Sequence, residues 1–346
     1  MKSRNSRGAR GALIVLCVFL GIVLAVMLAV TIFAVRMMNL VNRPENVPQE
    51  NLSQEQVDEL LSDEILPPEQ QDGVRVMLPE EIQWDAVPEK TLPETENVVN
   101  FLLIGQDTRG NYRARSDSMI LVTVNKRTHT ITLTSILRDL YVQIPGYQDN
   151  KINAAYPAGG MELLDEVLEV NFGIQVDANV EVDFSRFSQV VDTMGGVDLE
   201  LREDEAAHIN REVGYGGLTG GFMHLDGNQA LSYSRIRYLD RDADFSRTNR
   251  QRKVINALIE KVRSVGLGYL LDLAEELLPM VTTDMSNGDM IGYATELFPV
   301  LADCTIVSQR IPGDGAYELA IIREMSCVVA DMDAARELVR RTMAGE

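Results

Sequence analysis

The chain has 346 residues, of which 45% are apolar and 24% are charged. These proportions are typical of globular proteins and exclude whole-chain disorder or a collagen-like structure. The formal net charge is −20, yet residues 1–43 contain six basic residues and no acidic one. The remainder is therefore strongly acidic and repels phosphate backbones, which argues against nucleic-acid binding. An anionic ligand would need a local group of basic residues.

Residues 12–35 form an uncharged, mostly aliphatic run of 24 residues that follows a basic tail, residues 1–11. As a helix, the run would extend roughly 36 Å, enough to cross a hydrocarbon core of about 30 Å. Its length, and the poor cleavage site at its end, favour an uncleaved signal anchor over a signal peptide. The positive-inside rule then predicts a single-pass protein of the cell membrane, with a cytoplasmic N-terminus and an extracytoplasmic body.

Residues 36–96 are rich in Pro, Glu, Gln and Asn. This composition predicts an acidic, extended, extracytoplasmic linker, with which a short helix over 54–61 is compatible.

The body, residues 97–346, alternates strand and helix patterns. Strands are expected at 98–105, 118–125, 130–136, 179–184, 196–201 and 304–311. Helices are expected at 160–173, 185–196, 247–266, 268–279, 287–299 and 331–343. Because a short polar turn joins 118–125 to 130–136, these two strands should form an antiparallel hairpin. We therefore expect an α/β fold, a layered α-β-α domain with a central mixed sheet.

Three segments of the body concentrate arginine. The first, "GQDTRGNYRARSDS", follows the first strand, where α/β sheets commonly bind ligands. The second places Arg138 and Asp139 after the strand 130–136, and the third spans 235–253. Arginines directed at one place repel each other unless a multivalent anion lies between them, and guanidinium groups match phosphate oxygens. The alternative is a set of surface ion pairs worth about 0–1 kcal/mol each, but three such segments favour a phosphate site.

The spacing within these segments adds detail. Arg235 and Arg237 should share one side of an extended segment, and Arg247 and Gln251 one face near the start of a helix. Asp107 and Asp117 lie in the first segment, beside Arg109, and suit Mg²⁺ bridging to phosphate, because Mg²⁺ is usually held by one or two carboxylates plus phosphate oxygens.

Two cysteines of the body, Cys304 and Cys327, are both expected outside the cell membrane, where disulfides persist. A bond between them would close a 22-residue loop. Their even number and their compartment favour such a bond over two buried thiols.

Six motifs then occur in order: "NFLLIGQDTRGNYRARSDSMILVTVN", "SILRDLYVQIPG", "KINAAYPAGG", "VEVDFSRFSQVVDTMGGVDLEL", "LDGNQALSYSRIRY" and "DFSRTNRQRKVINAL". Together they resemble the LytR–CpsA–Psr family over about residues 97–265. The resemblance implies a phosphotransferase on the outer face of a bacterial membrane. Such enzymes move a glycopolymer, such as teichoic acid or capsule, from a polyprenyl-pyrophosphate carrier to peptidoglycan.

The resemblance also implies roles for individual residues. Asp107 and Asp117 match the family's metal-associated aspartates, for Mg²⁺ or Mn²⁺. The pyrophosphate-gripping positions are Arg115, Arg138, Arg235, Arg237, Arg247 and Gln251. Asp244 and Lys151 fall on further family motifs. The chain departs from the family in having Gln106 where Ser is frequent and Leu137 where Pro is frequent, and neither change removes a charge.

The chemistry so implied needs a base for the sugar hydroxyl, and we expect Asp117 rather than Asp107 to fill that role. The polyprenyl chain needs an apolar tunnel, which the apolar faces of 162–173 and 186–194 could line, ordinary core packing being the alternative. Two other functions are alternatives. One is a carrier-binding or regulatory module that holds polyprenyl-pyrophosphate lipids without turnover, which could use the arginines alone. The other is a pyrophosphate hydrolase with water as acceptor, which shares all of these residues.

Overall fold

The structure, a computed structural model, describes residues 36–37, 39–44, 51–62, 65–67, 73–84, 95–106, 113–240, 243–264 and 267–346. The predicted membrane segment, 12–35, lies outside these ranges, as do Asp107 and Arg109. Within these ranges no helix combines the length and the apolar character that crossing a bilayer requires.

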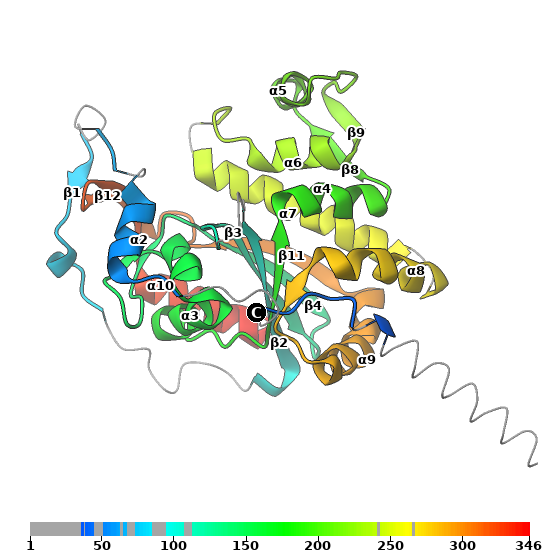
Figure 1. Ribbon diagram of the computed structural model, residues 1–346, viewed down its shortest axis with the longest axis horizontal. Coiled ribbons are helices and arrows are strands. Elements are labelled where there is room, and N and C mark those ends of the chain that lie inside the picture. The colour runs from blue at the N-terminus through cyan, green and yellow to red at the C-terminus, as the bar shows by residue number, and fades with distance from the viewer. Residues whose placement is uncertain are drawn as a thin grey trace, which may run out of the picture.

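A six-stranded mixed sheet lies at the centre (Figure 1). Its strand order is β10-β7-β2-β3-β4-β11, with bounds Thr282–Thr283, Ala178–Asp183, Val98–Gln106, Ser116–Asn125, Thr130–Ile136 and Thr305–Ile311. The strands β2, β3 and β4 pair antiparallel, whereas β7 and β11 join them in parallel. The predicted hairpin and the mixed sheet are thus confirmed.

Helices cover both faces of the sheet because the strands are apolar on both sides. On one face, Leu102 and Ile104 of β2 pack in a cluster with residues of α3 (Ala155–Phe172) and α10 (Met332–Ala344). On the other face, Val99 and Ile120 pack in a cluster with residues of α9 (Asn287–Asp303). The helices α4 (Phe184–Thr193), α7 (Ala243–Ser264) and α8 (Leu267–Leu277) lie on the same side as α9 (Figure 1). Helices on both faces of the sheet give the layered α-β-α arrangement that the sequence predicted.

A second group of elements stands above the sheet in Figure 1: β8 (Val197–Leu201), α5 (Glu203–Val213), β9 (Gly221–Leu225) and α6 (Gly227–Arg235). It packs with residues of α4, α7 and α8 in a separate hydrophobic cluster, and β8 pairs with β9. Of these elements only β8 was expected from the sequence. The sequence predicted an extended segment at Arg235 and Arg237. This prediction is wrong for Arg235, because a capping box of Asp226 and Gln229 starts a helix that ends at Arg235.

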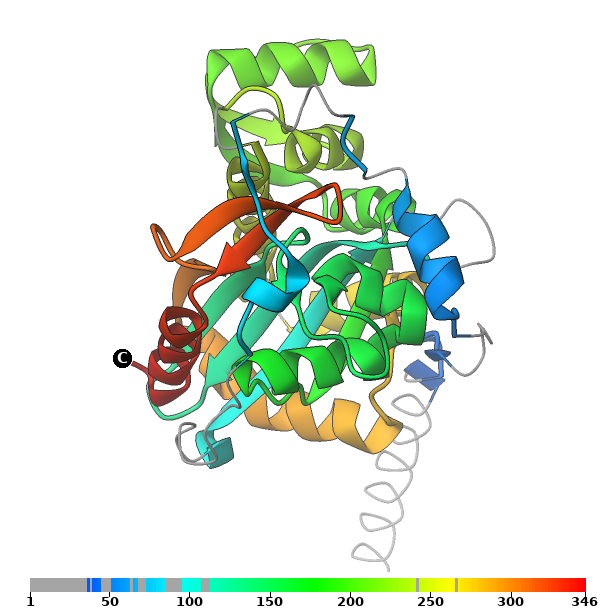
Figure 2. The ribbon, with the colours of Figure 1, turned by 90° about the vertical axis from the view of Figure 1, so that its left-hand side faces the viewer.

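The described parts of 36–96 do not form the extended linker that composition predicted. The short helix compatible with 54–61 is present as α2 (Gln54–Leu61), and its Val57 and Leu61 are buried in the main core. Figure 2 shows α2 beside α3. Further along, β1 (Arg75–Val76) pairs with β12 (Tyr317–Ile322), which pairs in turn with β13 (Met325–Ala330). A few well-spaced apolar residues therefore dock a segment whose average composition is that of a linker.

The remaining short elements are β5 (Tyr141–Val142), β6 (Asn150–Lys151) and four 3₁₀ turns, Pro79–Glu81, Thr95–Asn97, Ile152–Ala154 and Leu278–Met280.

The predicted disulfide is wrong. Cys304 follows α9 and belongs to the cluster on the α9 face of the sheet, whereas Cys327 lies in β13 and belongs to the cluster that contains α3. The sheet separates the two thiols, and each is buried among apolar side chains.

Candidate active site

Arg138 is the centre of a half-buried charge network at the end of β4. Its guanidinium donates a hydrogen bond of 2.6 Å to the Asp117 carboxylate on β3. The same guanidinium lies 3.5 Å from the Asp139 carboxylate and 3.8 Å from that of Asp244 on α7. Lys151 extends the network, because its ammonium lies 3.1 Å from Asp139. Two strands, a turn and a helix therefore bring four of the predicted site residues together.

The network sets the charge states of Asp117 and Arg138. Burial raises the pKa of Asp117, but attraction to Arg138, the hydrogen bond from it, and the charges of Arg247 and Arg237 outweigh burial and hold the pKa below its usual range. Burial opposes the charge of Arg138, yet Asp139, Asp117 and Asp244 raise its pKa above the ordinary value. Both groups are therefore charged at neutral pH.

The first turns of α7 carry Arg247 and Gln251 on one face, as the spacing predicted, and both side chains are turned inward. The Arg247 guanidinium donates to the Asp244 carboxylate over 2.8 Å. Burial is the largest of the effects that together lower the pKa of Arg247 to about 10. The nearby cations Arg138 and Arg237 act in the same direction, and Asp244 and Asp117 oppose them. Three guanidinium groups thus crowd one place, which is the electrostatic setting that a bound anion relieves.

The other two predicted arginines, Arg235 and Arg115, make different contacts. Arg235 is exposed at the end of α6, and its guanidinium carbon lies 5.2 Å from the centre of the Phe184 ring. Arg115 donates a hydrogen bond of 3.3 Å to the Leu60 carbonyl of α2. The docked segment before the sheet therefore reaches the edge of the site.

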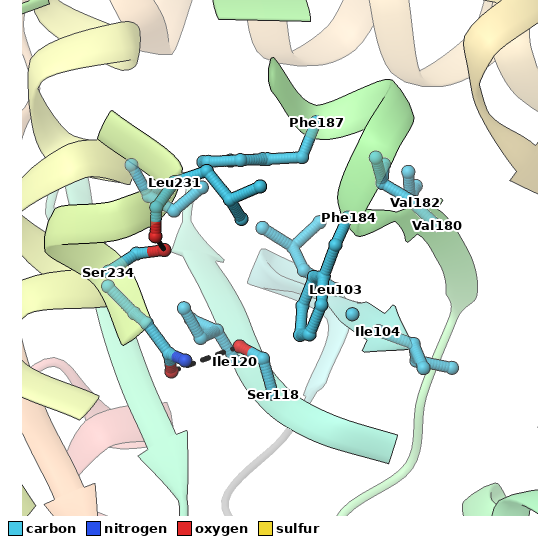
Figure 3. A pocket seen from close by; sticks show the side chains of 13 residues that line it. Leu103, Ile104, Ser118, Ile120, Val180, Val182, Phe184, Phe187, Leu231 and Ser234 are labelled. Atoms are coloured by element: carbon cyan, nitrogen blue, oxygen red, sulfur yellow. Dashed lines mark hydrogen bonds between the residues drawn. The ribbon is translucent and has the colours of Figure 1, made fainter. Parts of the chain in front are cut away.

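An apolar cavity of about 100 Å³ opens beside these charges. Figure 3 shows its lining from the sheet and from α4 and α6, with Ile120, Phe184 and Leu231 among the side chains. Gln251 and Ser118 lie at its polar side, where the Ser118 hydroxyl donates to the Gln251 side-chain oxygen over 3.1 Å. Phe187 lies in the segment 186–194 that was expected to line a tunnel, whereas 162–173 packs against the opposite face of the sheet.

The pairing of an apolar cavity with clustered arginines suits a lipid that carries phosphate groups. The model of the LytR_cpsA_psr family matches residues 72–338, which is most of the chain. The chain belongs to the LytR–CpsA–Psr family.

Relatives in the family agree with this assignment. The polyisoprenyl-teichoic acid–peptidoglycan teichoic acid transferase TagU of Bacillus cereus is 34% identical over 223 residues, which cover 63% of this chain and 69% of TagU. The crystal structure of B. subtilis TagT superposes with a TM-score of 0.59 at 27% identity, covering 79% of this chain and 100% of TagT. A structure of TagT with bound octaprenyl pyrophosphate lipid gives a TM-score of 0.57 at 27% identity, covering 76% of this chain and 98% of TagT.

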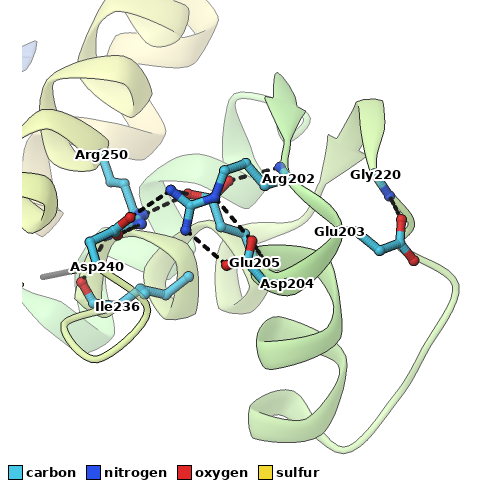
Figure 4. Close-up of polar contacts among 8 residues, drawn as sticks. All are labelled: Arg202, Glu203, Asp204, Glu205, Gly220, Ile236, Asp240 and Arg250. Carbon is cyan, nitrogen blue, oxygen red and sulfur yellow. Dashed lines mark hydrogen bonds and ion pairs between the residues drawn. The ribbon is translucent and has the colours of Figure 1, made fainter.

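Arg250 is a buried residue of the third arginine segment to which the sequence assigned no role. Figure 4 shows its guanidinium between α5 and the segment that follows α6. It donates to the Glu205 carboxylate over 2.8 Å, to the Ile236 carbonyl over 3.2 Å, and to the Asp240 carboxylate. Since Arg237 lies between Ile236 and Asp240, Arg250 holds the backbone that carries it. Partners 45 and 10 residues away leave no signal in local spacing.

The two aspartates that the sequence predicts to hold a metal are partly described. Asp107 lies outside the described residues, and among those that are described no group of three His, Cys, Asp or Glu side chains could hold a metal ion. Asp117 is ionised but paired with Arg138. One or two carboxylates suffice for Mg²⁺ when phosphate oxygens complete its shell. The described residues therefore supply one carboxylate, that of Asp117, toward such a shell.

Proposed function

We propose that this protein is a membrane-anchored phosphotransferase that moves an anionic glycopolymer from a polyprenyl-pyrophosphate carrier to peptidoglycan. The observation that carries the proposal is the nearness of the apolar cavity to the clustered arginines. Ser118 of its lining follows Asp117, the partner of Arg138, and Gln251 of its lining lies one helical turn after Arg247. An apolar cavity suits a prenyl chain and the arginines suit its pyrophosphate. The name of TagU and the lipid bound to TagT support the same substrate class.

In the proposed reaction, a peptidoglycan hydroxyl oxygen forms a bond to the phosphorus that carries the glycan. The bond between that phosphorus and the bridging oxygen of the pyrophosphate breaks, and polyprenyl phosphate leaves with the electron pair. The hydroxyl proton goes to solvent or to the departing phosphate. Arginines around the pyrophosphate neutralise the charge that gathers on the leaving group, which is how they accelerate the step.

Asp117 is better suited to holding charge than to removing a proton. Its lowered pKa makes it a weak base, contrary to the role expected from the sequence. The loose transition state of phosphoryl transfer needs positioning and electrostatic stabilisation more than an early base. Asp117 and Asp107 would hold Mg²⁺ or Mn²⁺, which when bound supplies positive charge to the phosphate oxygens.

The test uses the full chain in detergent micelles with a short-chain polyprenyl-pyrophosphoryl glycan, Mg²⁺ and peptidoglycan oligomers. Mass spectrometry should detect a phosphodiester-linked product, which Arg138→Ala and Asp117→Ala abolish. Arg340→Ala on α10, where the arginine pairs with Glu337 away from the site, is the matched control and should retain activity. Released glycan phosphate without linkage would show a hydrolase instead, and tight binding without either product would show a carrier-binding module.

The predicted topology has its own test. Protease added outside intact spheroplasts should digest the body, residues 97–346, and a body protected from that protease would contradict both the membrane orientation and the proposed transfer.

A further inference from the structure

A second hollow, of about 420 Å³, is lined by residues of α5 and α6 and of the segments that follow them. We call it the tyrosine pocket, because Tyr215 and Tyr238 line it together with Glu212, Asn228, Arg235 and Arg237. It contains aromatic rings, hydrogen-bonding groups of both kinds and two cations, which is a different composition from that of the apolar cavity.

The two tyrosines present their rings to solvent. Tyr238 is 89% exposed, directly after Arg237 in the chain. Tyr215 is 44% exposed, and its hydroxyl donates to the Asp226 carboxylate, with oxygen–oxygen distances of 2.9 and 3.0 Å. Asp226 also caps α6, so the Tyr215 ring is tied to a rigid element. Exposed aromatic side chains beside polar groups are typical of binding sites, because their faces accept apolar surface while the polar groups fix orientation.

The tyrosine pocket adjoins the apolar cavity, and two contacts connect their linings. Leu231 lines both the apolar cavity and the tyrosine pocket. Arg235 lines the tyrosine pocket, and its guanidinium lies over the ring of Phe184, which lines the apolar cavity. The molecule therefore offers, in order, an apolar cavity, arginine charges and an aromatic, polar pocket. A lipid-linked glycan presents the matching order of prenyl chain, phosphate and sugar.

We propose that the tyrosine pocket binds a pyranose ring of the carbohydrate substrate, with its C–H face against Tyr238 and its hydroxyls toward Glu212 and Asn228. This inference rests on the proposed function and adds the residues that select the glycan, namely Tyr238 with Glu212 and Asn228. The ligand of the pocket would be a sugar next to a phosphate. This sugar belongs either to the donor glycan or to the peptidoglycan acceptor. The continuity with Arg235 favours the donor.

The experiment measures binding to the full chain in detergent without turnover, using polyprenyl pyrophosphate and polyprenyl-pyrophosphoryl-N-acetylglucosamine as the two probes. Tyr238→Ala should weaken binding of the sugar-bearing lipid about fivefold to tenfold, the range expected for one aromatic contact, and leave binding of the sugar-free lipid unchanged. Phe222→Ala is the matched control, because Phe222 is 75% exposed on β9 and does not line the tyrosine pocket.

A rise in KM for peptidoglycan oligomers in Tyr238→Ala, with unchanged binding of both lipids, would assign the sugar to the acceptor. Equal affinities of wild type and Tyr238→Ala for both lipids, with an unchanged KM, would overturn the inference. So would an equal effect of Phe222→Ala. Sugar-dependent binding without any transfer would contradict the proposed function alone, so the two failures are distinguishable.

Discussion

Asp117 and Arg138 lie 21 residues apart in the chain, and the hairpin of β3 and β4 brings them to a hydrogen bond of 2.6 Å. Asp117 stands at the start of β3, and Arg138 follows the end of β4, so antiparallel pairing places both at one edge of the sheet. The pair supplies the site with a fixed cation and a fixed anion, and Ser118, the neighbour of Asp117, lines the apolar cavity.

We expect Asp117→Asn to lower the rate of glycopolymer transfer by about 100-fold or more, the usual effect of removing one preorganised electrostatic group. Asn keeps the shape of the side chain and loses its charge, so the fold should persist. Initial rates in the mass-spectrometric assay check this prediction. Asp314→Asn is the control, because Asp314 is an exposed carboxylate paired with Arg310 outside the network, and its rate should match wild type.

Asp117 also makes the free energy of unfolding depend on pH in the acidic range. Because the folded-state pKa of Asp117 is lowered, its contribution to the free energy of unfolding is present above the unfolded pKa, near 3.8, and is lost as the pH falls through the folded value. Urea unfolding at a series of acidic pH values should show a smaller decline for Asp117→Asn than for wild type. An equal decline in both proteins would contradict the assignment.

Arg138→Met should destabilise the protein by about 3–5 kcal/mol, because three carboxylates lose a shared, partly buried cation. Arg138→Lys keeps the charge and should recover much of this stability in urea unfolding. It should not recover transfer, because an ammonium group cannot reproduce the fork of a guanidinium on pyrophosphate. Recovery of both properties by lysine would show that charge alone matters here.

Arg250→Met should also destabilise, by roughly 3 kcal/mol, since it leaves the buried Glu205 carboxylate without its nearest charge partner. Arg340→Met on α10 removes a more exposed pair with Glu337 and should change the free energy of unfolding much less. Thermal unfolding of the two variants side by side gives the comparison. Equal losses would mean that burial of Arg250 does not set its effect.

Asp165 predicts a second pH dependence of opposite sign. Burial raises the pKa of Asp165 to about 7, against a hydrogen bond from Asn179 and together with repulsion from Asp284 and Glu162. Its contribution to the free energy of unfolding is therefore fully present below the unfolded pKa, near 3.8, and is lost as the pH rises through about 7. Asp165→Asn should flatten the fall in Tm with rising pH across this window. A wild-type Tm that is constant in this window would contradict the raised pKa.

Local patterns in the sequence were sufficient for much of the sheet. The structure has β2 where the sequence predicted a strand at 98–105, and the hairpin β3–β4 where it predicted one at 118–125 and 130–136. These predictions succeed because the apolar pattern of a strand and a polar turn are both visible in short stretches of sequence. The periodic stretches at 247–266 and 331–343 became α7 and α10 for the same reason. The face shared by Arg247 and Gln251 followed from helical spacing alone.

Other features depended on partners far away in the chain. The composition of 36–96 predicted a linker. In the structure, Val57 and Leu61 of this segment pack in a core that is formed mostly by later residues. In addition, β1 pairs with a strand some 240 residues further along the chain. Cys304 and Cys327 met the conditions for a disulfide in number and compartment, but opposite faces of the sheet separate them.

The sequence by itself determined the family motifs, the main strands and helices, and the residue types that suit a pyrophosphate, because these depend on periodicity, caps and side-chain chemistry within short stretches. The tertiary structure alone decided that Arg138 faces three carboxylates, that Arg250 holds the segment of Arg237, and that the tyrosine pocket adjoins the apolar cavity. The physical reason is that hydrogen bonds, burial and pKa values depend on which groups the fold brings within a few ångströms, and this is a property of topology rather than of local sequence.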